Sequence, residues 1–335
     1  MKPVRTAVLV SLAGALSVGT SLGIAAPSVR SSVDARRMDD LAKLAPAAFG
    51  HSGKVRALFV APNTLLALPL KWSAAPPGDV TYAWQPVAGT RSPGLLGSAR
   101  LSLGIQAPPA SGIWRLRLNA GAWQQELGDL AVITRVPFDV KQDGYLNGYH
   151  IGRYPTEGEL REDAYAPPPG FVEVTPDNQD TRVSEHFRLR DFLTKDQLEV
   201  WPKYVALDAR ELDKLELVMQ ELNAMGVRAA RLNIMSGYRT PQYNGPGGDG
   251  RARLSRHMYG DASDVWVDDD GNGYMDDLNG DGRIDEHDGE VIRRAVDRVE
   301  AAFPDLTGGC GVYLSSDTHG PFVHIDARGT RARWQ

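Results

Sequence analysis

The chain has 335 residues, of which 42% are hydrophobic, and a formal net charge of -5 at pH 7. A chain of this length can bury a substantial core and is long enough for two domains. The segment 268–288 holds nine acidic residues and one basic residue, so it carries -8 and the remainder about +3 (-5 minus -8). No basic patch stands out, and we therefore expect no nucleic-acid partner.

Residues 1–26 have the layout of a secretory signal peptide. Lys2 and Arg5 precede an apolar run that ends in Ala25-Ala26-Pro27. A basic start, an apolar centre and small residues at the exit are typical of a cleaved export signal. The run is also long enough for an uncleaved membrane anchor. We expect cleavage, no stable membrane span afterwards, and a periplasmic or secreted protein.

Residues 27–53 are rich in Ser, Ala and Arg, and we interpret them as a spacer. Residues 54–137 then show short alternating runs broken by Pro and Gly, which predict an immunoglobulin-like β-sandwich. In the run 113–118, Trp114, Leu116 and Leu118 share one face, as a half-buried strand requires. Further strands are expected at 57–60, 65–72, 81–84 and 99–105. The domain contains no catalytic constellation, and two roles stay open for it: binding of glycan or protein by its exposed loops, or a spacer or docking role.

Residues 138–182 are rich in Tyr, Gly, Pro and Asp, and they predict an extended connector that packs on the next domain. A helix follows. Asp208 is its expected N-cap, with Glu211 at the capping-box spacing, and Gly226 ends it. Its apolar face comprises Leu212, Leu215, Met219 and Leu222. Residues 227–235 predict a buried strand that delivers Arg239 to the edge of a cleft.

Two motifs near the C-terminus supply a set of metal ligands. The first, residues 255–264, contains His257 and Asp264, and the second, residues 322–326, contains His324. Two imidazoles and one carboxylate, with a fourth position left for water, are typical of a catalytic zinc site. Gly260 permits a tight turn between His257 and the strand of Asp264. Zinc would supply a hydroxide nucleophile at neutral pH, which suits hydrolysis of an amide or ester.

The acidic segment 268–288 follows directly and has the spacing of a calcium loop, with Gly273 at the turn position. A second, overlapping register starts at Asp277 and leads into an amphipathic helix after Asp288. We expect one or two calcium ions that support the shape and stability of the cleft rather than the chemistry. The alternative is a solvated acidic loop without an ion. The candidate ligands are Asp268, Asp270, Asn272, Asp276, Asp277, Asn279, Asp281, Asp285 and Asp288.

The motif Ser-x-His-x-x-Gly-x-Ala-x-Asp, followed by Phe-Val-His-Ile-Asp, resembles the zinc D-Ala-D-Ala carboxypeptidase and murein endopeptidase family. That family shares its fold with lysostaphin-type peptidases and the hedgehog signalling domain. Residues 236–240, 311–313 and 328–334 also match, most closely the murein endopeptidase branch. The resemblance implies an α+β zinc peptidase domain over residues 183–335, with an antiparallel sheet, flanking helices and a calcium-loop insertion. Its substrate would be a peptidoglycan peptide.

The same resemblance suggests the remaining roles. Arg239 would bind a substrate carboxylate or the developing oxyanion, and His319 would stabilise the transition state or shuttle a proton. Many relatives place a catalytic carboxylate where this chain has Pro321. Asp326 is therefore the first candidate general base, with Asp317 second, although Asp326 is as well suited to orienting a ligand.

Two residues near these motifs have simpler explanations. Cys310 is the only cysteine, which excludes a disulfide within the chain, and we expect it to be a small buried residue rather than a nucleophile. For His186, in the Ser-x-His-Phe opening of the domain, we expect a structural role rather than a place in the cleft.

Three functions remain open at this point. The favoured one is an exported zinc endopeptidase that acts on peptidoglycan stem peptides or cross-links. A D-Ala-D-Ala carboxypeptidase would use the same chemistry at a different end of the substrate. A non-catalytic surface module that binds zinc and calcium is the third. The sequence does not decide which bond is cleaved, the role of the sandwich or the oligomeric state.

Overall fold

A computed structural model describes residues 40–91, 94, 96–158, 160, 162–245 and 251–335. The predicted signal peptide and residues 27–39 of the predicted spacer lie outside the described residues. Within the described ranges, no helix combines the length and apolar character needed to cross a membrane. The remainder of the predicted spacer contains β1 (Ala42–Leu44) and a 3-10 turn (Pro46–Phe49).

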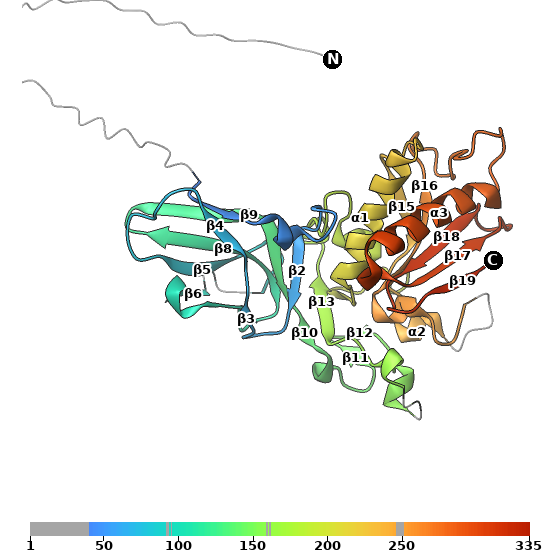
Figure 1. Ribbon diagram of the computed structural model, residues 1–335. Coiled ribbons are helices and arrows are strands. Elements are labelled where there is room, and N and C mark those ends of the chain that lie inside the picture. The colour runs from blue at the N-terminus through green and yellow to red at the C-terminus, as the bar shows by residue number, and fades with distance from the viewer. Residues whose placement is uncertain (1–39, 92–93, 95, 159, 161, 246–250) are drawn as a thin grey trace, which may run out of the picture. The chain divides into compact units, whose positions relative to one another are not determined.

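The first half of the described chain is all-β. A five-stranded sheet has the order β2-β9-β8-β5-β6, and two short pairs, β1-β4 and β3-β7, accompany it (Figure 1). Trp114, Leu116 and Leu118 of β8 are buried, which confirms the predicted strand face. A single strand over residues 99–105 is wrong, because a 3-10 turn at Leu101–Leu103 separates β6 from β7. A single strand over residues 65–72 is also wrong, because β3 and β4 are separate and pair with different strands. The immunoglobulin-like assignment stays a prediction. The strand bounds are β2 Ala57–Val60, β3 Leu65–Leu66, β4 Leu70–Trp72, β5 Thr81–Pro86, β6 Leu96–Arg100, β7 Ile105–Gln106, β8 Gly112–Ala120 and β9 Trp123–Thr134.

Residues 136–205 build a second, smaller layer. Strands β10 (Val136–Pro137), β13 (Gly170–Val174) and β14 (Lys203–Val205) form an antiparallel sheet, and β11 (Tyr145–Leu146) pairs with β12 (Tyr149–His150). The hydroxyls of Tyr154 and Tyr238 lie 2.9 Å apart, so this layer is fastened to the segment that carries Arg239. Short 3-10 turns complete the connections, at Phe138–Val140, Pro155–Glu157, Asp163–Tyr165, Leu189–Phe192, Arg256–Tyr259 and Pro304–Leu306.

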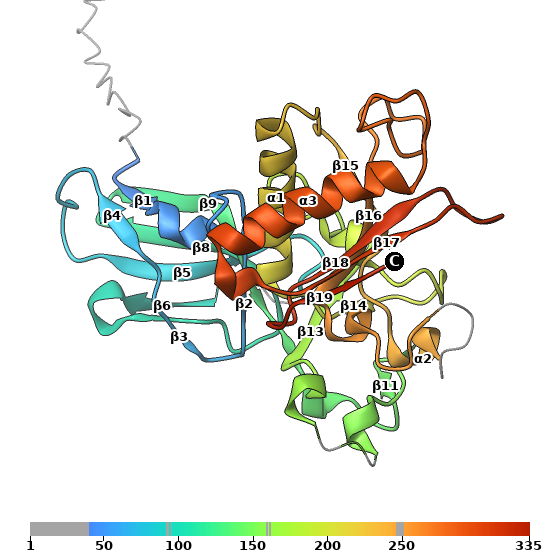
Figure 2. The same ribbon diagram turned by 45° about the vertical axis from the view of Figure 1, so that its right-hand side comes forward.

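The C-terminal half is α+β, as predicted. Its sheet has the order β15-β16-β18-β17-β19, with β15 Leu232–Ser236, β16 Ala262–Val267, β17 Gly309–Tyr313, β18 Phe322–Asp326 and β19 Ala332–Trp334. All neighbours are antiparallel except β17 and β19. The helices α1 (Ala209–Ala224) and α3 (Glu286–Ala302) pack together and cover one face of the sheet (Figures 1 and 2). The short helix α2 spans Pro241–Asn244. The opposite face of the sheet is left for the site.

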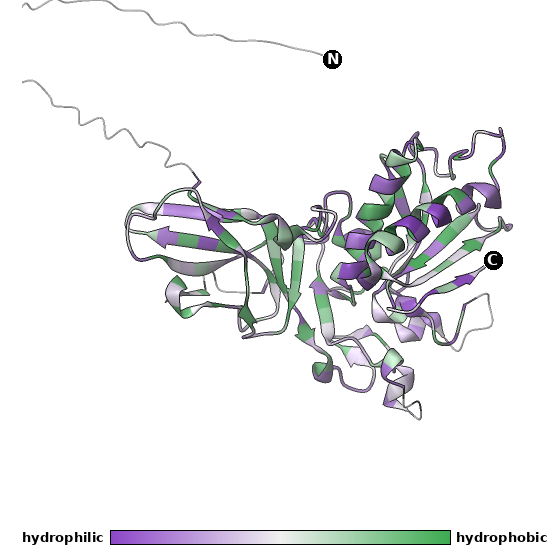
Figure 3. Cartoon of the chain, viewed as in Figure 1, coloured by the Kyte–Doolittle hydropathy of each residue, from purple (hydrophilic) through white to green (hydrophobic). Residues whose placement is uncertain are grey.

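The ends of both long helices follow their capping residues. The Asp208 side chain accepts from Arg210 N, which confirms the predicted N-cap of α1, whereas Glu211 is fully buried and does not complete a capping box. Asp285 caps α3, and Asp288 already lies inside that helix. Figure 3 shows hydrophilic and hydrophobic residues alternating along both helices, as expected for elements with one face on the sheet.

One hydrophobic core cluster runs through both halves, and a second lies within the all-β half. Ala57, Ile113 and Ile133 of the β-domain belong to the same buried cluster as Val183 and Tyr204. Backbone hydrogen bonds also cross between the halves, from Arg56 N to Val183 O at 2.8 Å and from Glu185 N to Lys54 O at 2.8 Å. Residues 40–335 therefore pack as one unit.

Candidate metal centre

The register of β16 and β18 brings two predicted ligands together. Asp264 lies directly opposite His324, and both side chains are buried on the face of the sheet away from α1 and α3. His257 joins them from the 3-10 turn before β16. Gly260 ends that turn at a φ of +77°, and a Cβ there would lie 2.3 Å from the carbonyl carbon of Ala206. Glycine is therefore required where the chain turns back to form β16.

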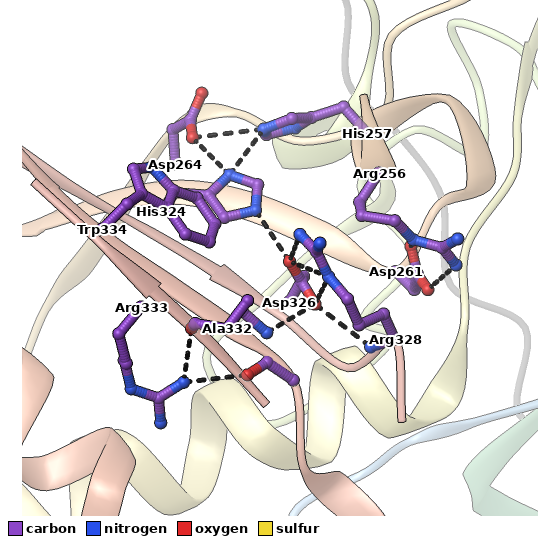
Figure 4. A network of polar contacts seen from close by, with 12 residues as sticks. Arg256, His257, Asp261, Asp264, His324, Asp326, Arg328, Ala332, Arg333 and Trp334 are labelled. Atoms are coloured by element: carbon purple, nitrogen blue, oxygen red, sulfur yellow. Dashed lines mark hydrogen bonds and ion pairs between the residues drawn. The ribbon is translucent and has the colours of Figure 1, made fainter. Parts of the chain in front are cut away.

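The three ligand atoms form a nearly equilateral triangle (Figure 4). The distances among His257 Nε2, His324 Nδ1 and Asp264 Oδ1 are each 3.1 Å. Ligands at about 2.0–2.1 Å from a tetrahedral zinc ion lie roughly 3.3 Å apart. The triangle therefore has the dimensions of one face of a zinc coordination tetrahedron.

The hydrogen bonds around the triangle decide which atoms carry protons. His257 Nδ1 lies 2.7 Å from Gly237 O, and a carbonyl only accepts, so the proton is on Nδ1. His324 Nε2 lies 3.0 Å from Asp326 Oδ2. A carboxylate oxygen also only accepts, so the proton of His324 is on Nε2. The lone pairs of both imidazoles then point at each other and at the carboxylate of Asp264. This arrangement requires a cation among the three atoms.

The electrostatics agree with this assignment. Burial lowers the pKa of His257 and favours its neutral form. Burial raises the pKa of Asp264, but the charges and hydrogen bonds of the two histidines outweigh it, so that this pKa lies below its usual range. Burial lowers the pKa of His324, yet the hydrogen bonds to Asp264 and Asp326 reverse the direction and raise it.

Asp326 lies behind His324 and is fully buried. Its carboxylate accepts from Gly309 N at 2.8 Å, from Arg328 Nε at 2.8 and 2.9 Å, and from Arg328 Nη2. It does not line the cleft in front of the metal ligands. A general base must reach a proton of the reacting groups. Of the two roles expected for Asp326, its position suits orientation of His324 better than general-base catalysis.

Glycines on β17 make room for these contacts. A Cβ on Gly309 would lie 2.3 Å from Asp326 Oδ2, and one on Gly311 would lie 2.1 Å from Trp334 Nε1. The Trp334 ring consequently packs 5.2 Å from the His324 ring, centroid to centroid, and its Nε1 donates to the Tyr313 hydroxyl at 2.9 Å. The Gly-Gly-Cys-Gly run thus has a packing explanation, and Cys310 points to the other face, where burial raises its pKa to about 12.

A cleft of about 630 Å³ opens in front of the metal ligands. Arg239 and His319 both line it, as the sequence led us to expect. Arg239 Nε donates to Ser236 Oγ at 2.7 Å and its Nη2 donates to Asp264 Oδ2, so Arg239 also holds the metal-ligating carboxylate. Among the described residues that line the cleft, Asp264 is the only carboxylate. Asp317 is exposed and lies outside this lining.

The sequence patterns did not identify every residue of the cleft. Tyr313 of β17, Trp334 of β19 and Arg328, between β18 and β19, line it, and Tyr165 lines it from the segment interpreted as a connector. The period-two alternation of β17 could have pointed to Tyr313, two residues after Gly311. No sequence pattern around Tyr165 indicates that it lines the cleft. His186, by contrast, binds Glu216 at 2.7 Å through Nδ1 and takes no part in the lining, in agreement with a structural role.

The acidic segment forms two successive loops with the same internal geometry. In the first, Asp268 accepts from Asn272 N and from Gly273 N, both at 3.0 Å. In the second, Asp277 accepts from Asp281 N at 3.2 Å and from Gly282 N at 2.8 Å. Carboxylate oxygens of Asp268, Asp270 and Asp276 lie within 4.8 Å of one another. Asp288 is fully buried and accepts from Leu278 N and Asn279 N, which ties the second loop to α3.

The remaining candidate calcium ligands follow the same pattern. Asn272 accepts from Tyr274 N at 2.8 Å, and Asn279 accepts from Asp281 N at 2.8 Å. Asp281 accepts from Arg283 N, and Asp285 accepts from His287 N, both at 2.9 Å. In both loops, side-chain oxygens thus accept hydrogen bonds from nearby backbone N–H groups.

Comparison with known proteins identifies one family. Residues 193–279 match the family model of Peptidase M15, which confirms the resemblance to the zinc D-Ala-D-Ala carboxypeptidase family. The matched segment contains Arg239, His257 and Asp264 and ends before β18. No curated protein matches the chain, and no solved structure does.

Proposed function

Because residues 193–279 belong to the Peptidase M15 family, we propose that the chain is an exported zinc peptidase that hydrolyses amide bonds in peptidoglycan stem peptides or cross-links. The observation that carries the proposal is the triangle of His257, Asp264 and His324, in which three electron-pair donors face one point. The layout of residues 1–26 supports export to the periplasm or the medium.

The residues present fit zinc. The imidazoles of His257 and His324 and the carboxylate of Asp264 would hold the ion, on the side of the triangle that faces the cleft. Zinc in such a site polarises a carbonyl group and lowers the pKa of bound water to about 7. The protein fixes the ligands: Gly237 O and Asp326 set the tautomers of the two histidines, and Arg239 restrains Asp264.

Tyr313 is the best-placed donor for the negative charge that develops on the substrate. Its hydroxyl accepts a hydrogen bond from Trp334 Nε1, so its own proton is available to an acceptor in the cleft. Burial raises the pKa of Tyr313, which keeps the hydroxyl protonated at neutral pH. Hydrogen bonds that strengthen as charge develops are a major source of catalysis in acyl transfer. His319 lines the same cleft and suits proton transfer to the leaving amine.

We propose calcium as the ion of the two acidic loops. In both loops, side-chain oxygens of alternate residues accept hydrogen bonds from the backbone of the loop, and in the first loop Asp268, Asp270 and Asp276 also converge. Burial and the charges of Asp270, Asp269 and Asp268 raise the pKa of Asp276 against a backbone hydrogen bond that lowers it, so the carboxylates repel one another without a cation. Since Asp288 fastens the second loop to α3, calcium would stabilise the wall beside the cleft.

Digestion of purified sacculi and of a pentapeptide ending in D-Ala-D-Ala tests the proposal. We expect zinc-dependent release of cleaved cross-links from sacculi, identified by mass spectrometry. Release of terminal D-Ala alone would assign a D-Ala-D-Ala carboxypeptidase instead. If the zinc-loaded protein cleaves neither substrate, only the non-catalytic binding module remains. The variant His257→Ala, which removes one ligand, is the control for metal dependence.

A further inference from the structure

A second groove continues the cleft along the same face of the sheet. Its volume is about 420 Å³, and it shares Met235, His319 and Phe322 with the lining of the cleft. Trp266 and Phe322 stand two residues from Asp264 and His324, in the same direction along the antiparallel strands β16 and β18. Side chains two residues apart share a face of a sheet. The groove therefore lies directly beside the metal ligands, further along β16 and β18 on the same face of the sheet.

The far wall of the groove comes from the first acidic loop. Asn272, Gly273, Tyr274 and Met275 line it, opposite residues 318–321 of the segment that leads into β18. The loop lies at the end of β16, beside the first turn of α3 (Figure 2). Tyr274 is 65% exposed although it is a large aromatic residue, and it stands at this wall. An exposed aromatic side chain at the rim of a groove is typical of a binding surface.

The cleft and the groove differ in chemistry. Four arginines line the cleft, at positions 239, 251, 256 and 328. None of the described residues that line the groove is an arginine, lysine, aspartate or glutamate. Its lining combines Met235, Trp266, Tyr274, Met275, Pro321 and Phe322 with the polar residues Asn272, Thr318 and His319. Three of the arginines in the cleft already pair with carboxylates, Arg239 with Asp264, Arg256 with Asp261 and Arg328 with Asp326. The cleft is therefore lined by ion pairs, whereas the groove favours an uncharged segment of a ligand.

We propose that this groove is a substrate subsite, which binds an uncharged, extended stretch of the peptide on the side of the scissile bond opposite the arginines. The inference rests on the proposed peptidase function and deepens it. Binding surfaces on both sides of the metal ligands allow the peptide to continue in both directions from the bond that is cleaved. Such a site suits an internal bond of a cross-linked peptide better than a bond one residue from a chain end.

Blocking the groove tests this assignment. Gly320 lines the groove, its φ lies outside the left-handed range, and a Cβ there meets no atom within 4 Å. The variant Gly320→Leu should therefore fold normally and fill part of the groove. Gly78→Leu is the matched control, because Gly78 has the same open surroundings and lies in the β-domain. Tyr274→Ala removes the exposed wall residue without touching the metal ligands.

Two substrates separate the subsite from the chemistry. The wild type first identifies the bond cleaved in cross-linked muropeptide dimers, and an acyl-dipeptide containing only that bond serves as the short substrate. For Gly320→Leu and Tyr274→Ala we expect KM for the dimer to rise about tenfold, equivalent to roughly 1.4 kcal/mol of binding free energy. The value of kcat/KM for the short substrate should change less than twofold, and zinc content should be unchanged.

Three results would overturn the inference. Unchanged dimer kinetics for Gly320→Leu would exclude the groove as a subsite while the proposed function stands. An equal loss on both substrates through kcat would indicate a disturbed His319 instead of a lost subsite. Failure of the wild type to cleave any peptide would remove the proposed function itself, and the inference with it.

Discussion

Two aspartates next to the same imidazole have different tasks in this site. Asp264 faces Nδ1 of His324 together with His257, whereas Asp326 faces Nε2 from the buried side. Burial raises the pKa of Asp326, but its hydrogen bonds to His324 and Arg328 outweigh burial and keep this pKa below its usual range. Both carboxylates are therefore ionised at neutral pH. One contacts the metal position, and the other orients the ligand that does.

The variant Asp326→Asn distinguishes orientation of His324 from general-base catalysis. Loss of an orienting carboxylate typically weakens metal binding by about 10- to 100-fold. We therefore expect a higher Kd for zinc in competition with a chelator, and activity that recovers as zinc is added. A general base would give the opposite result, with zinc affinity retained and kcat lost at saturating zinc.

The Tyr313 hydroxyl can be tested in the same way. If it donates to the developing oxyanion, Tyr313→Phe should lower kcat by roughly 10²-fold, as removal of one such donor does elsewhere. Zinc content should not change, because Tyr313 contacts no ligand side chain through its hydroxyl. Tyr145→Phe, outside the cleft, is the control for loss of a phenolic hydroxyl. An unchanged kcat would contradict the assignment.

The acidic loops connect β16, which carries a metal ligand, with α3, which supports the sheet. The backbone of Leu278 and Asn279 binds Asp288 in the first turn of α3, so the position of the helix end depends on the order of the loop. Calcium binding to these loops would therefore stabilise β16 and α3 together, and not only the loops themselves.

Calcium should raise the melting temperature of the zinc-loaded protein. An ion present at 100 times its Kd stabilises the folded state by about 2.7 kcal/mol. Asp277→Asn, which removes one carboxylate from the second loop, should reduce the calcium-dependent shift measured by calorimetry. Asp143→Asn is the matched control, since Asp143 is exposed and distant from the loops in sequence. The role is refuted if EGTA, which spares zinc, changes neither the melting temperature nor the activity.

Contacts between residues close together in the sequence could be predicted, whereas most contacts between residues far apart could not. The ligands were predictable because a short motif and the alternation of two strands place them. The N-cap of α1 was predictable because Asp208 contacts a residue only two positions further along the chain. The choice between the two roles of Asp326 could not be made from the sequence, because its contacts with Gly309 and Arg328 form only after β17 and β18 pair. The capping role predicted for Glu211 was wrong, because the pattern considers only neighbouring residues, whereas distant parts of the chain bury Glu211.

At the scale of the whole molecule, Glu211 links stability to pH. Burial raises its pKa, the charge of Lys214 opposes this, and the charges of Asp326 and Asp261 add to it, with the net direction upward. The folded protein thus keeps a proton that the unfolded chain releases above about pH 4.3. The contribution of Glu211 to stability is full below that pH and is lost as pH rises toward its folded-state pKa.

The variant Glu211→Gln should remove this contribution, because an amide resembles the protonated acid and does not titrate. Relative to the wild type, its free energy of unfolding should increase by up to about 1.4 kcal/mol per pH unit above pH 4.3. Urea denaturation across pH 4–8 measures the difference. Glu221→Gln on the same helix controls for loss of a carboxylate. A constant difference between wild type and Glu211→Gln at every pH would show that Glu211 is ionised in the folded state.

The shared hydrophobic core bears on how the protein can be dissected. His51 N and Ser52 N donate to the Asp213 carboxylate on α1 at 2.8 and 2.9 Å, and Ala57 and Ile113 pack with residues of the other half. A recombinant fragment beginning at residue 183 would expose this apolar surface to water and leave Asp213 without two donors. The intact protein should melt in a single cooperative transition, and such a fragment should aggregate on expression.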